Sequence, residues 1–123
     1  SMDCAPAMYH SIKAGKPVEV EEKDSLADAL LGGIGLDNQY SYPMVAKYVD
    51  TIELVSEQEI EQGIVQGFLR YGILIEGAAA VTLAWLLKNQ THGLGKSIVG
   101  ILSGGNMDTR LFSTILAKHN RTN

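Results

Sequence analysis

The tetrapeptide Ser103 to Asn106 stands between a short apolar run, Ile98 to Leu102, and an amphipathic stretch, Met107 to Lys118. An apolar run followed by a helical pattern predicts the end of a buried strand that turns into a helix. In open parallel sheets, ligands bind outside the carboxyl ends of the strands, and adjacent glycines let the backbone approach a bound group. The tetrapeptide is therefore a candidate binding loop, and a purely structural tight turn is the alternative.

The residues before this loop repeat the alternation of strand and helix. Thr51 to Val55 has strand character, and Ser56 with Glu59 predicts a capping box that begins a helix, which Gly72 can close. Residues 78–87 are apolar on all sides and predict a helix that is covered on every face. Such alternation is typical of an α/β fold in which helices flank an open parallel sheet.

The first half of the chain predicts shorter elements. We expect helices over Ala5 to Ala14, Ser25 to Leu31 and Tyr42 to Val49, and a short strand over Pro17 to Val20. The sequence contains no evident linker or repeat, so residues 1–123 are expected to form a single domain. Two later helices are expected to bury apolar stripes, which are Ile60, Ile64, Val65, Phe68 and Leu69, then Leu111, Phe112, Ile115 and Leu116.

Charge and composition argue against several classes of protein. The net charge of −4 and the scattered basic residues give no phosphate-binding surface, so nucleic acid is not an expected partner. The longest apolar stretch, Ile73 to Leu87, contains Glu76 and is shorter than the ~20 residues of a membrane span. Cys4 is the only cysteine, which allows no intrachain disulfide and favours a reducing, cytoplasmic compartment.

The order of several short motifs carries a family resemblance. The motifs are Ser25-Leu26-Ala27-Asp28, Gly32-Gly33-Ile34-Gly35, Val55-Ser56-Glu57, Leu74-Ile75-Glu76-Gly77-Ala78 and Ile101-Leu102-Ser103-Gly104-Gly105-Asn106. This succession resembles the carboxyl-terminal part of the fold-type II pyridoxal-phosphate enzymes that dehydrate serine and threonine. Within that group, the branch of ectoine- and hydroxyectoine-utilisation dehydratases is the most similar, on the basis of Leu26-Ala27-Asp28-Ala29-Leu30 followed by Gly32-Gly33-Ile34-Gly35-Leu36-Asp37-Asn38.

The resemblance implies roles for the candidate loop and for one glutamate. Ser103 corresponds to the serine that hydrogen-bonds the pyridine nitrogen of the cofactor, Gly104 and Gly105 keep the loop thin, and Asn106 is either a ligand or a helix cap. Glu76 corresponds to a glutamate beside the cofactor ring, where a carboxyl group can take part in proton transfer. From the residues alone, Glu76 is instead a cap on the following helix.

The chain also departs from the family pattern. Ala29 stands where the family usually has the glycine of Ala-Asp-Gly, and the glycines at positions 32, 33 and 35 do not form the GxGxxG pattern of a phosphate-binding loop. Ser1 and Pro6 stand where many relatives hold a divalent cation with acidic side chains, and Asp3 is a poor substitute. Because hard cations prefer carboxylate oxygens, no metal site is expected there.

The covalent anchor of the cofactor is the most important departure. The family chemistry requires a lysine that binds the cofactor and a glycine-rich loop that binds its phosphate, and both lie upstream of the motifs that match here. The lysines of this chain lack the family's surrounding motif and are expected to be solvated; they are Lys13, Lys16, Lys23, Lys47, Lys88, Lys96 and Lys118. Pyridoxal phosphate is thus the cofactor of the intact family, and this chain alone is not expected to bind it.

Three functional hypotheses follow, in order of preference. The first is a fragment of a dehydratase that eliminates water from hydroxyamino acids only together with its missing amino-terminal part. The second is a non-catalytic module for small-molecule binding or assembly, and the third is an independent enzyme that uses Glu76, His10 or His92 as acid or base. Exposed apolar surface and strand edges would also predict a homodimer or a higher oligomer.

Overall fold

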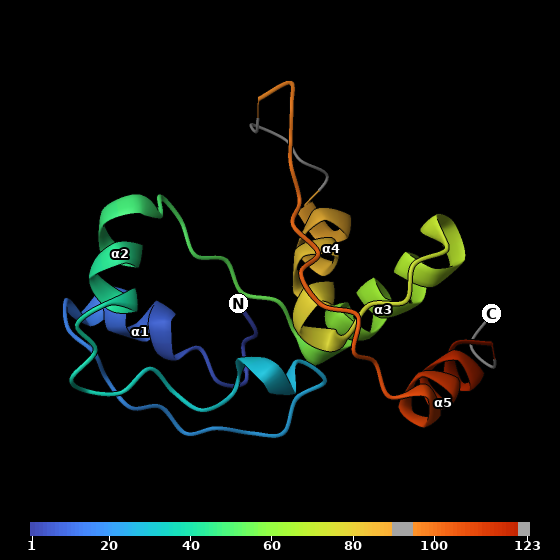
Figure 1. The fold of residues 1–123 in the computed structure, drawn as a ribbon, viewed down its shortest axis with the longest axis horizontal. Helices are drawn as coiled ribbons and strands as arrows, with labels where there is room; N and C mark the ends of the chain where they lie inside the picture. Colours follow the sequence, from blue (N-terminus) through green and yellow to red (C-terminus); the bar gives the residue numbers. More distant parts are fainter. Residues whose placement is uncertain (90–94, 121–123) are drawn as a thin grey trace.

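The computed structural model describes residues 1–89 and 95–120. Helices and long loops make up this part of the chain (Figure 1). The helical elements, in order, are α1 (Ala7–Ala14), the 3-10 turn η1 (Asp28–Leu30), α2 (Ser41–Tyr48), α3 (Glu57–Tyr71), α4 (Gly77–Asn89) and α5 (Thr109–Asn120).

Local sequence signals determine where α3 begins and ends. The Ser56 hydroxyl accepts a hydrogen bond from the Glu59 amide at 3.3 Å, and the Glu59 carboxylate accepts one from the Ser56 amide at 2.8 Å. This reciprocal pair satisfies two amides that have no partner inside the helix. Gly72 ends the helix in the left-handed region at φ 66°, which an L side chain rarely adopts. The predicted capping box and closing glycine are confirmed.

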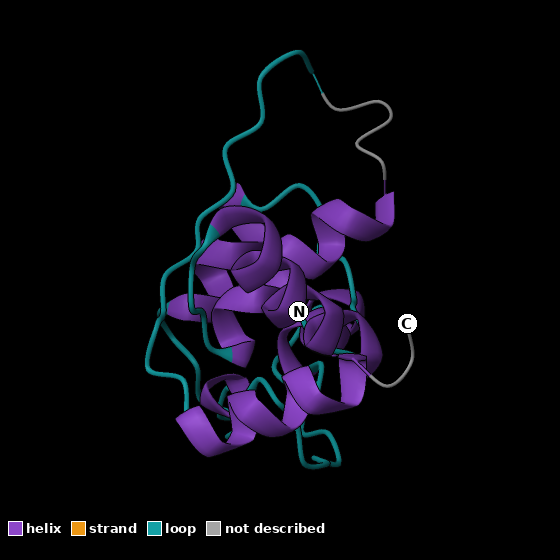
Figure 2. Ribbon diagram, turned by 90° about the vertical axis from the view of Figure 1, so that its right-hand side faces the viewer, coloured by secondary structure: helices purple, strands orange, loops and turns teal. Residues whose placement is uncertain are grey.

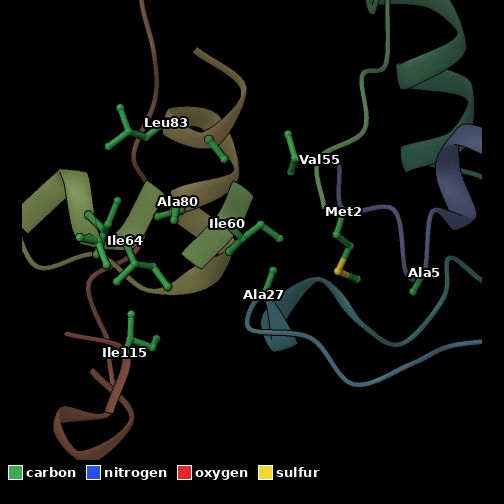
Figure 3. Close-up of a cluster of buried hydrophobic side chains, with 13 residues drawn as sticks. Met2, Ala5, Ala27, Val55, Ile60, Ile64, Ala80, Leu83 and Ile115 are labelled. Carbon is green, nitrogen blue, oxygen red and sulfur yellow. The ribbon is translucent and has the colours of Figure 1, made fainter. Parts of the chain in front are cut away.

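The core lies mainly between α3 and α4 (Figure 3). Ile60, Ile64 and Ala80 are almost fully buried there. Gly63 permits the close approach of the two helices, because a Cβ at this position would lie 2.8 Å from the carbonyl oxygen of Ala80. The predicted stripe on α3 is only partly correct, since Leu69 is 56% exposed.

The helix α5 packs against α3. Its Ile115 side chain is buried in the core, and its Phe112 ring meets Phe68 of α3 edge to face, with 5.0 Å between the ring centroids. Such aromatic contacts add to the free energy gained from burial. The expected apolar stripe on α5 is therefore used, although its first member, Leu111, is 40% exposed.

The helices α1 and α2 contact each other and form the other end of the molecule (Figure 1). A parallel bridge between Met2 and Val55 connects this end to α3, and both of these side chains are buried in the core. No helix in the described part of the chain combines the length and the apolar composition that crossing a membrane requires.

The predicted sheet is represented only by that single bridge within residues 1–89 and 95–120 (Figure 2). Residues 98–102, expected as a buried strand, form an exposed irregular segment beside α4, with Val99 89% and Ile101 73% exposed. A strand is defined by backbone hydrogen bonds to a neighbour, and these residues have no described backbone partner on either edge.

Three expectations about individual elements need correction. The helix expected over residues 25–31 is reduced to the short turn η1, and residues 17–20 form no strand. The helix α4 is not covered on every face, since Val81 and Trp85 line an open groove. A helix that is apolar all round predicts complete burial only if the chain supplies enough neighbouring elements.

Candidate functional site

The loop Ser103 to Asn106 lies beside the residue that precedes α4, Glu76. The Glu76 amide donates to the carbonyl oxygen of Gly104 at 3.3 Å, and the Asn106 amide donates to Glu76 Oε2 at 3.0 Å. Two hydrogen bonds therefore join segments that are about 30 residues apart in the sequence. The structure thus brings together the four loop residues and the glutamate that the resemblance selected.

Gly104 is required for this contact. A Cβ at position 104 would lie 2.1 Å from Glu76 Oε1, so no side chain fits without displacing the carboxylate. Gly105 has more space, because its nearest neighbour would be the Leu74 carbonyl oxygen at 3.4 Å. The first of the two glycines therefore fixes the position of the glutamate, and the second is less constrained.

The carboxylate of Glu76 binds the loop, although the residue itself lies at the start of a helix. Glu76 precedes α4, and its carbonyl oxygen accepts from the Ala80 amide at 2.9 Å, but its half-buried side chain bonds to Asn106. Glu76 Oε1 makes no hydrogen bond with any described residue. One carboxylate oxygen is thus held in place and the other is available to a ligand.

Ser103 and Asn106 differ from the simplest expectations. Ser103 is exposed, and its hydroxyl makes no hydrogen bond with a described residue. Asn106 is not the cap of α5: the helix begins at Thr109, and Asp108 Oδ1 accepts from the amides of Arg110 and Leu111 at 2.7 and 2.9 Å. The cap of α5 is therefore Asp108 and not Asn106.

A pocket of about 550 Å³ opens beside this loop. Its lining includes Glu76, Gly77 and Asn106, together with Asp24, Ser25, Leu26, Asp28 and Ala29. Five acidic residues contribute to its lining, and none of its lining residues is basic; the acidic residues are Asp24, Asp28, Glu57, Glu76 and Asp108. Because like charges repel, this lining disfavours a phosphate group inside the pocket.

Glu57, the first residue of α3, holds the segment 24–29 in position. Its carboxylate accepts hydrogen bonds from the Ser25 hydroxyl and, at 2.8 Å, from the Leu26 amide. The Cys4 thiol donates to the same carboxylate at 3.6 Å. Burial raises the pKa of the Cys4 thiol, and the charge of Glu57 adds to that rise. The sequence did not predict this positioning role. The only signal was that Glu57, in the first turn of the helix, is not needed for the capping box, which uses Glu59.

Comparison with known proteins identifies the family. A family model described as pyridoxal-phosphate dependent enzyme matches residues 2–104. The chain belongs to this family. Relatives include a Sinorhizobium fredii protein named as a threonine dehydratase, 40% identical over 116 residues, and the L-threonine ammonia-lyase of Geobacter sulfurreducens, 35% identical over 114 residues. These matches cover 94% and 93% of this chain, and 35% and 28% of the relatives.

The fold agrees with this assignment. The structure of maize serine racemase superimposes with a TM-score of 0.79 at 25% identity, over 97% of this chain and 37% of that one. The chain therefore spans about a third of the length of the proteins it matches.

The residues of this site fit one end of the family's cofactor. The exposed hydroxyl of Ser103 and the free Oε1 of Glu76 are suited to the polar atoms of a pyridine ring. The phosphate end does not fit. The loop with glycines at 32, 33 and 35 has positive φ angles of 109°, 62° and 73°, and the Gly32 amide donates to the Glu22 carboxylate at 2.9 Å. The Gly32 amide is therefore already used by a carboxylate of this chain, and none of these three glycines lines the pocket beside Glu76.

The lysines of this chain lie on the surface. All seven are exposed, as predicted, and none lines the pocket beside Glu76. Lys88 and Lys118 pair with Glu59 and Glu61 on α3, at 3.1 and 2.6 Å. Lys13 lies over the ring of Tyr9 on α1. No described lysine is therefore placed to bind a cofactor at the Glu76 site.

The remaining candidates lie apart from this site. His10 is exposed on α1 and packs against the Tyr9 ring. His92 falls outside the described residues. At Ser1, where the resemblance places one of the family's acidic cation ligands, the amino group donates to the carbonyl oxygen of Glu53 at 2.7 Å. Among the described residues, no group of three or more His, Cys, Asp or Glu side chains is arranged to hold a metal ion.

Proposed function

We propose that this chain is the carboxyl-terminal part of a serine or threonine dehydratase-like lyase and contributes the binding site for the pyridine ring. The observation that carries this proposal is the pair of hydrogen bonds that hold Glu76 and the loop from Ser103 to Asn106 together. The reaction of the complete enzyme would eliminate water from a hydroxyamino acid and release an oxo acid and ammonia. By the motifs of residues 26–30 and 32–38, the ectoine-utilisation branch is the specific subfamily that we favour.

Ser103 would bind the ring nitrogen. Its hydroxyl is exposed and can donate a hydrogen bond to that nitrogen or accept one from it. A hydroxyl does not force the nitrogen to carry a proton, as a carboxylate would, so the ring remains a milder electron acceptor. When bound, pyridoxal phosphate stabilises negative charge that develops on the amino acid. A milder acceptor suits the loss of a β-hydroxyl group.

Glu76 would act at the edge of the ring. The Asn106 amide fixes its Oε2 atom, and Oε1 is free to hold or accept a proton. Gly104 leaves the space that this carboxylate occupies. The side chain is half-buried, so its charge interacts more strongly with a ligand than it would in bulk water.

The lysine and the phosphate-binding loop would come from the part of the enzyme that this chain does not span. The seven lysines are exposed and the pocket beside Glu76 is acidic. We therefore infer that the chain alone catalyses no turnover and works with an amino-terminal partner segment. The expected cytoplasmic location and single-domain organisation remain predictions.

Complementation tests this function. The probe is the Geobacter sulfurreducens L-threonine ammonia-lyase shortened to the portion that this chain does not match. We expect oxo-acid formation from L-threonine in the mixture, and none from either component. Ser103→Ala should lower kcat/KM of the mixture by tenfold or more, whereas Ser113→Ala, on the exposed face of α5, should leave it unchanged. Activity that is insensitive to Ser103→Ala would contradict the assigned ring contact.

A further inference from the structure

A second, more apolar groove of about 830 Å³ runs along the open face of α4. Val81, Thr82, Trp85 and Leu86 of that helix line it. Residues 48–53 and residues 98–100 also line it, and we call these two segments its first and second walls. Gly100 holds the second wall against the helix, because a Cβ at this position would lie 3.2 Å from Thr82 Cγ2 and 3.3 Å from Leu86 Cδ1. We call this surface the α4 groove.

Just after the first wall, the chain already pairs with another segment at Val55. The Val55 amide donates to the Ser1 carbonyl oxygen, and the Asp3 amide donates to the Val55 carbonyl oxygen, both at 2.9 Å. This pairing is parallel. It stops at Glu53, and the backbone groups of residues 50–52 make no hydrogen bond with the described part of the chain. Residues 50–52 therefore present unpaired backbone groups next to the paired residues Glu53 and Val55.

The second wall has the composition of an internal strand of a parallel sheet. Residues 98–102 form an almost continuous apolar run, which is typical of strands that are covered on both faces. Val99 and Ile101 are nevertheless 89% and 73% exposed, and no described backbone group bonds to residues 97–103. Apolar surface and unpaired backbone on the same segment favour the addition of a strand.

The arrangement of these walls points to one occupant. This chain superimposes over 97% of its length on maize serine racemase, of which it covers only 37%. Within the described residues, however, the backbone of residues 50–52 and 98–102 has no hydrogen-bonding partner. A second copy fits less well. A twofold axis pairs identical edges antiparallel, whereas the existing pairing at Val55 is parallel.

We propose that the α4 groove binds an extended apolar strand from the portion of the pyridoxal-phosphate dependent enzyme that this chain does not span. The strand would add in parallel to residues 50–52 and would cover Val99 and Ile101. This inference rests on the proposed function, since it takes the partner to be the remainder of the same enzyme. It adds the surface, the chemistry and the strand direction of the contact.

Hydrogen exchange tests the inference with the shortened Geobacter enzyme as the probe. We expect the amides of residues 50–52 and 98–102 to become at least tenfold more protected in the mixture than in the chain alone. Val99→Lys should weaken the complex tenfold or more, because it places a charge in the groove. Its matched control is Leu36→Lys, an apolar residue that is 57% exposed outside the groove, and this change should leave binding intact.

Each other outcome overturns the inference. Complex formation with new protection confined to other segments would assign the contact elsewhere. Protection of both walls in the chain alone, with a dimer mass in native solution, would make a second copy the occupant. Absence of any complex at high micromolar concentrations would also overturn it. Oxo-acid formation is recorded separately, so a protected complex without turnover would count against the proposed function and leave the groove assignment standing.

Discussion

Gly77, the first residue of α4, lies directly against the carbonyl group of Leu26. A Cβ at position 77 would stand 1.8 Å from the Leu26 oxygen and 2.8 Å from the Ala27 nitrogen. These atoms belong to the backbone, so they cannot move aside as the end of a flexible side chain can. The start of α4 and the segment that lines the acidic pocket are therefore fixed relative to each other by the absence of a side chain.

Gly77→Ala should destabilise the protein because it overpacks this contact. We expect the free energy of unfolding to fall by about 2 kcal/mol, within the usual range for such changes. Urea unfolding monitored by circular dichroism measures the effect. Gly95→Ala is the control, since a Cβ there meets nothing within 4 Å. Equal midpoints for both variants would show that the Leu26 contact is not tight.

Gly104→Ala should disturb the geometry of the site while leaving the stability of the fold almost unchanged. The new Cβ would push against Glu76 Oε1, which is the end of a flexible side chain, so stability should change little. The displaced carboxylate should lose its bond to Asn106, and complemented turnover should fall tenfold or more. Gly105→Ala, with a nearest neighbour at 3.4 Å, should have a smaller effect on turnover. Similar losses for the two variants would count against the Glu76 contact.

Glu57→Gln should make the Cys4 thiol more reactive. Burial and the Glu57 charge both raise the pKa of this thiol, so less thiolate is present near pH 8 than in a free cysteine. Removing the charge should lower that pKa and shift the pH profile of iodoacetamide alkylation to lower pH. Glu61→Gln, on the same helix but paired with Lys118, should leave the profile unchanged. An unshifted profile in Glu57→Gln would show that the Glu57 charge does not influence the pKa of the Cys4 thiol.

The capping box of α3 should give the stability a defined pH dependence. The hydrogen bond from the Ser56 amide is the main cause that lowers the pKa of Glu59 in the folded chain, with a contribution from Lys88. This stabilisation is complete above the unfolded pKa near 4.5 and is lost as the pH falls through the lower folded value. Urea unfolding between pH 7 and pH 3 should show this loss, and Glu59→Gln should reduce it. A pH dependence that Glu59→Gln leaves unaltered would contradict the assignment.

Ser56→Ala tests the other half of the capping box. Loss of its hydroxyl leaves the Glu59 amide without a side-chain partner, so the free energy of unfolding should fall by about 1 kcal/mol at pH 7. Ser97→Ala, at an exposed position without a described hydrogen bond, is the matched control and should be neutral. A neutral Ser56→Ala would mean that water replaces the cap at no cost.

Helix boundaries followed from the sequence where the signal is local. Ser56, Glu59 and Gly72 act within one turn of their own backbone, so the sequence pattern is sufficient to predict the ends of α3. The same holds for Gly15, which ends α1 at φ 70°. The sheet did not follow in this way, because residues 98–102 become a strand only beside a partner, and the described chain offers none.

The site was predictable in part for a similar reason. The family resemblance selected Glu76 and Ser103 to Asn106 together, and the structure places them side by side. Glu57 was missed because its partners, Ser25 and Leu26, precede it by more than 30 residues and no helical pattern connects them. Asn106 was wrongly considered as a cap, since Asp108 two residues later is the better acceptor for the first amides of α5.

The position of the cofactor's covalent linkage is the most direct test of the account. The chain and the shortened Geobacter enzyme are mixed with pyridoxal phosphate, the linkage is fixed with borohydride, and mass spectrometry locates the modified lysine. We predict stoichiometric modification of a lysine in the partner and only scattered, substoichiometric labelling of the exposed lysines in this chain. Stoichiometric modification of one of the seven lysines of this chain, together with turnover of L-threonine without the partner, would contradict the account.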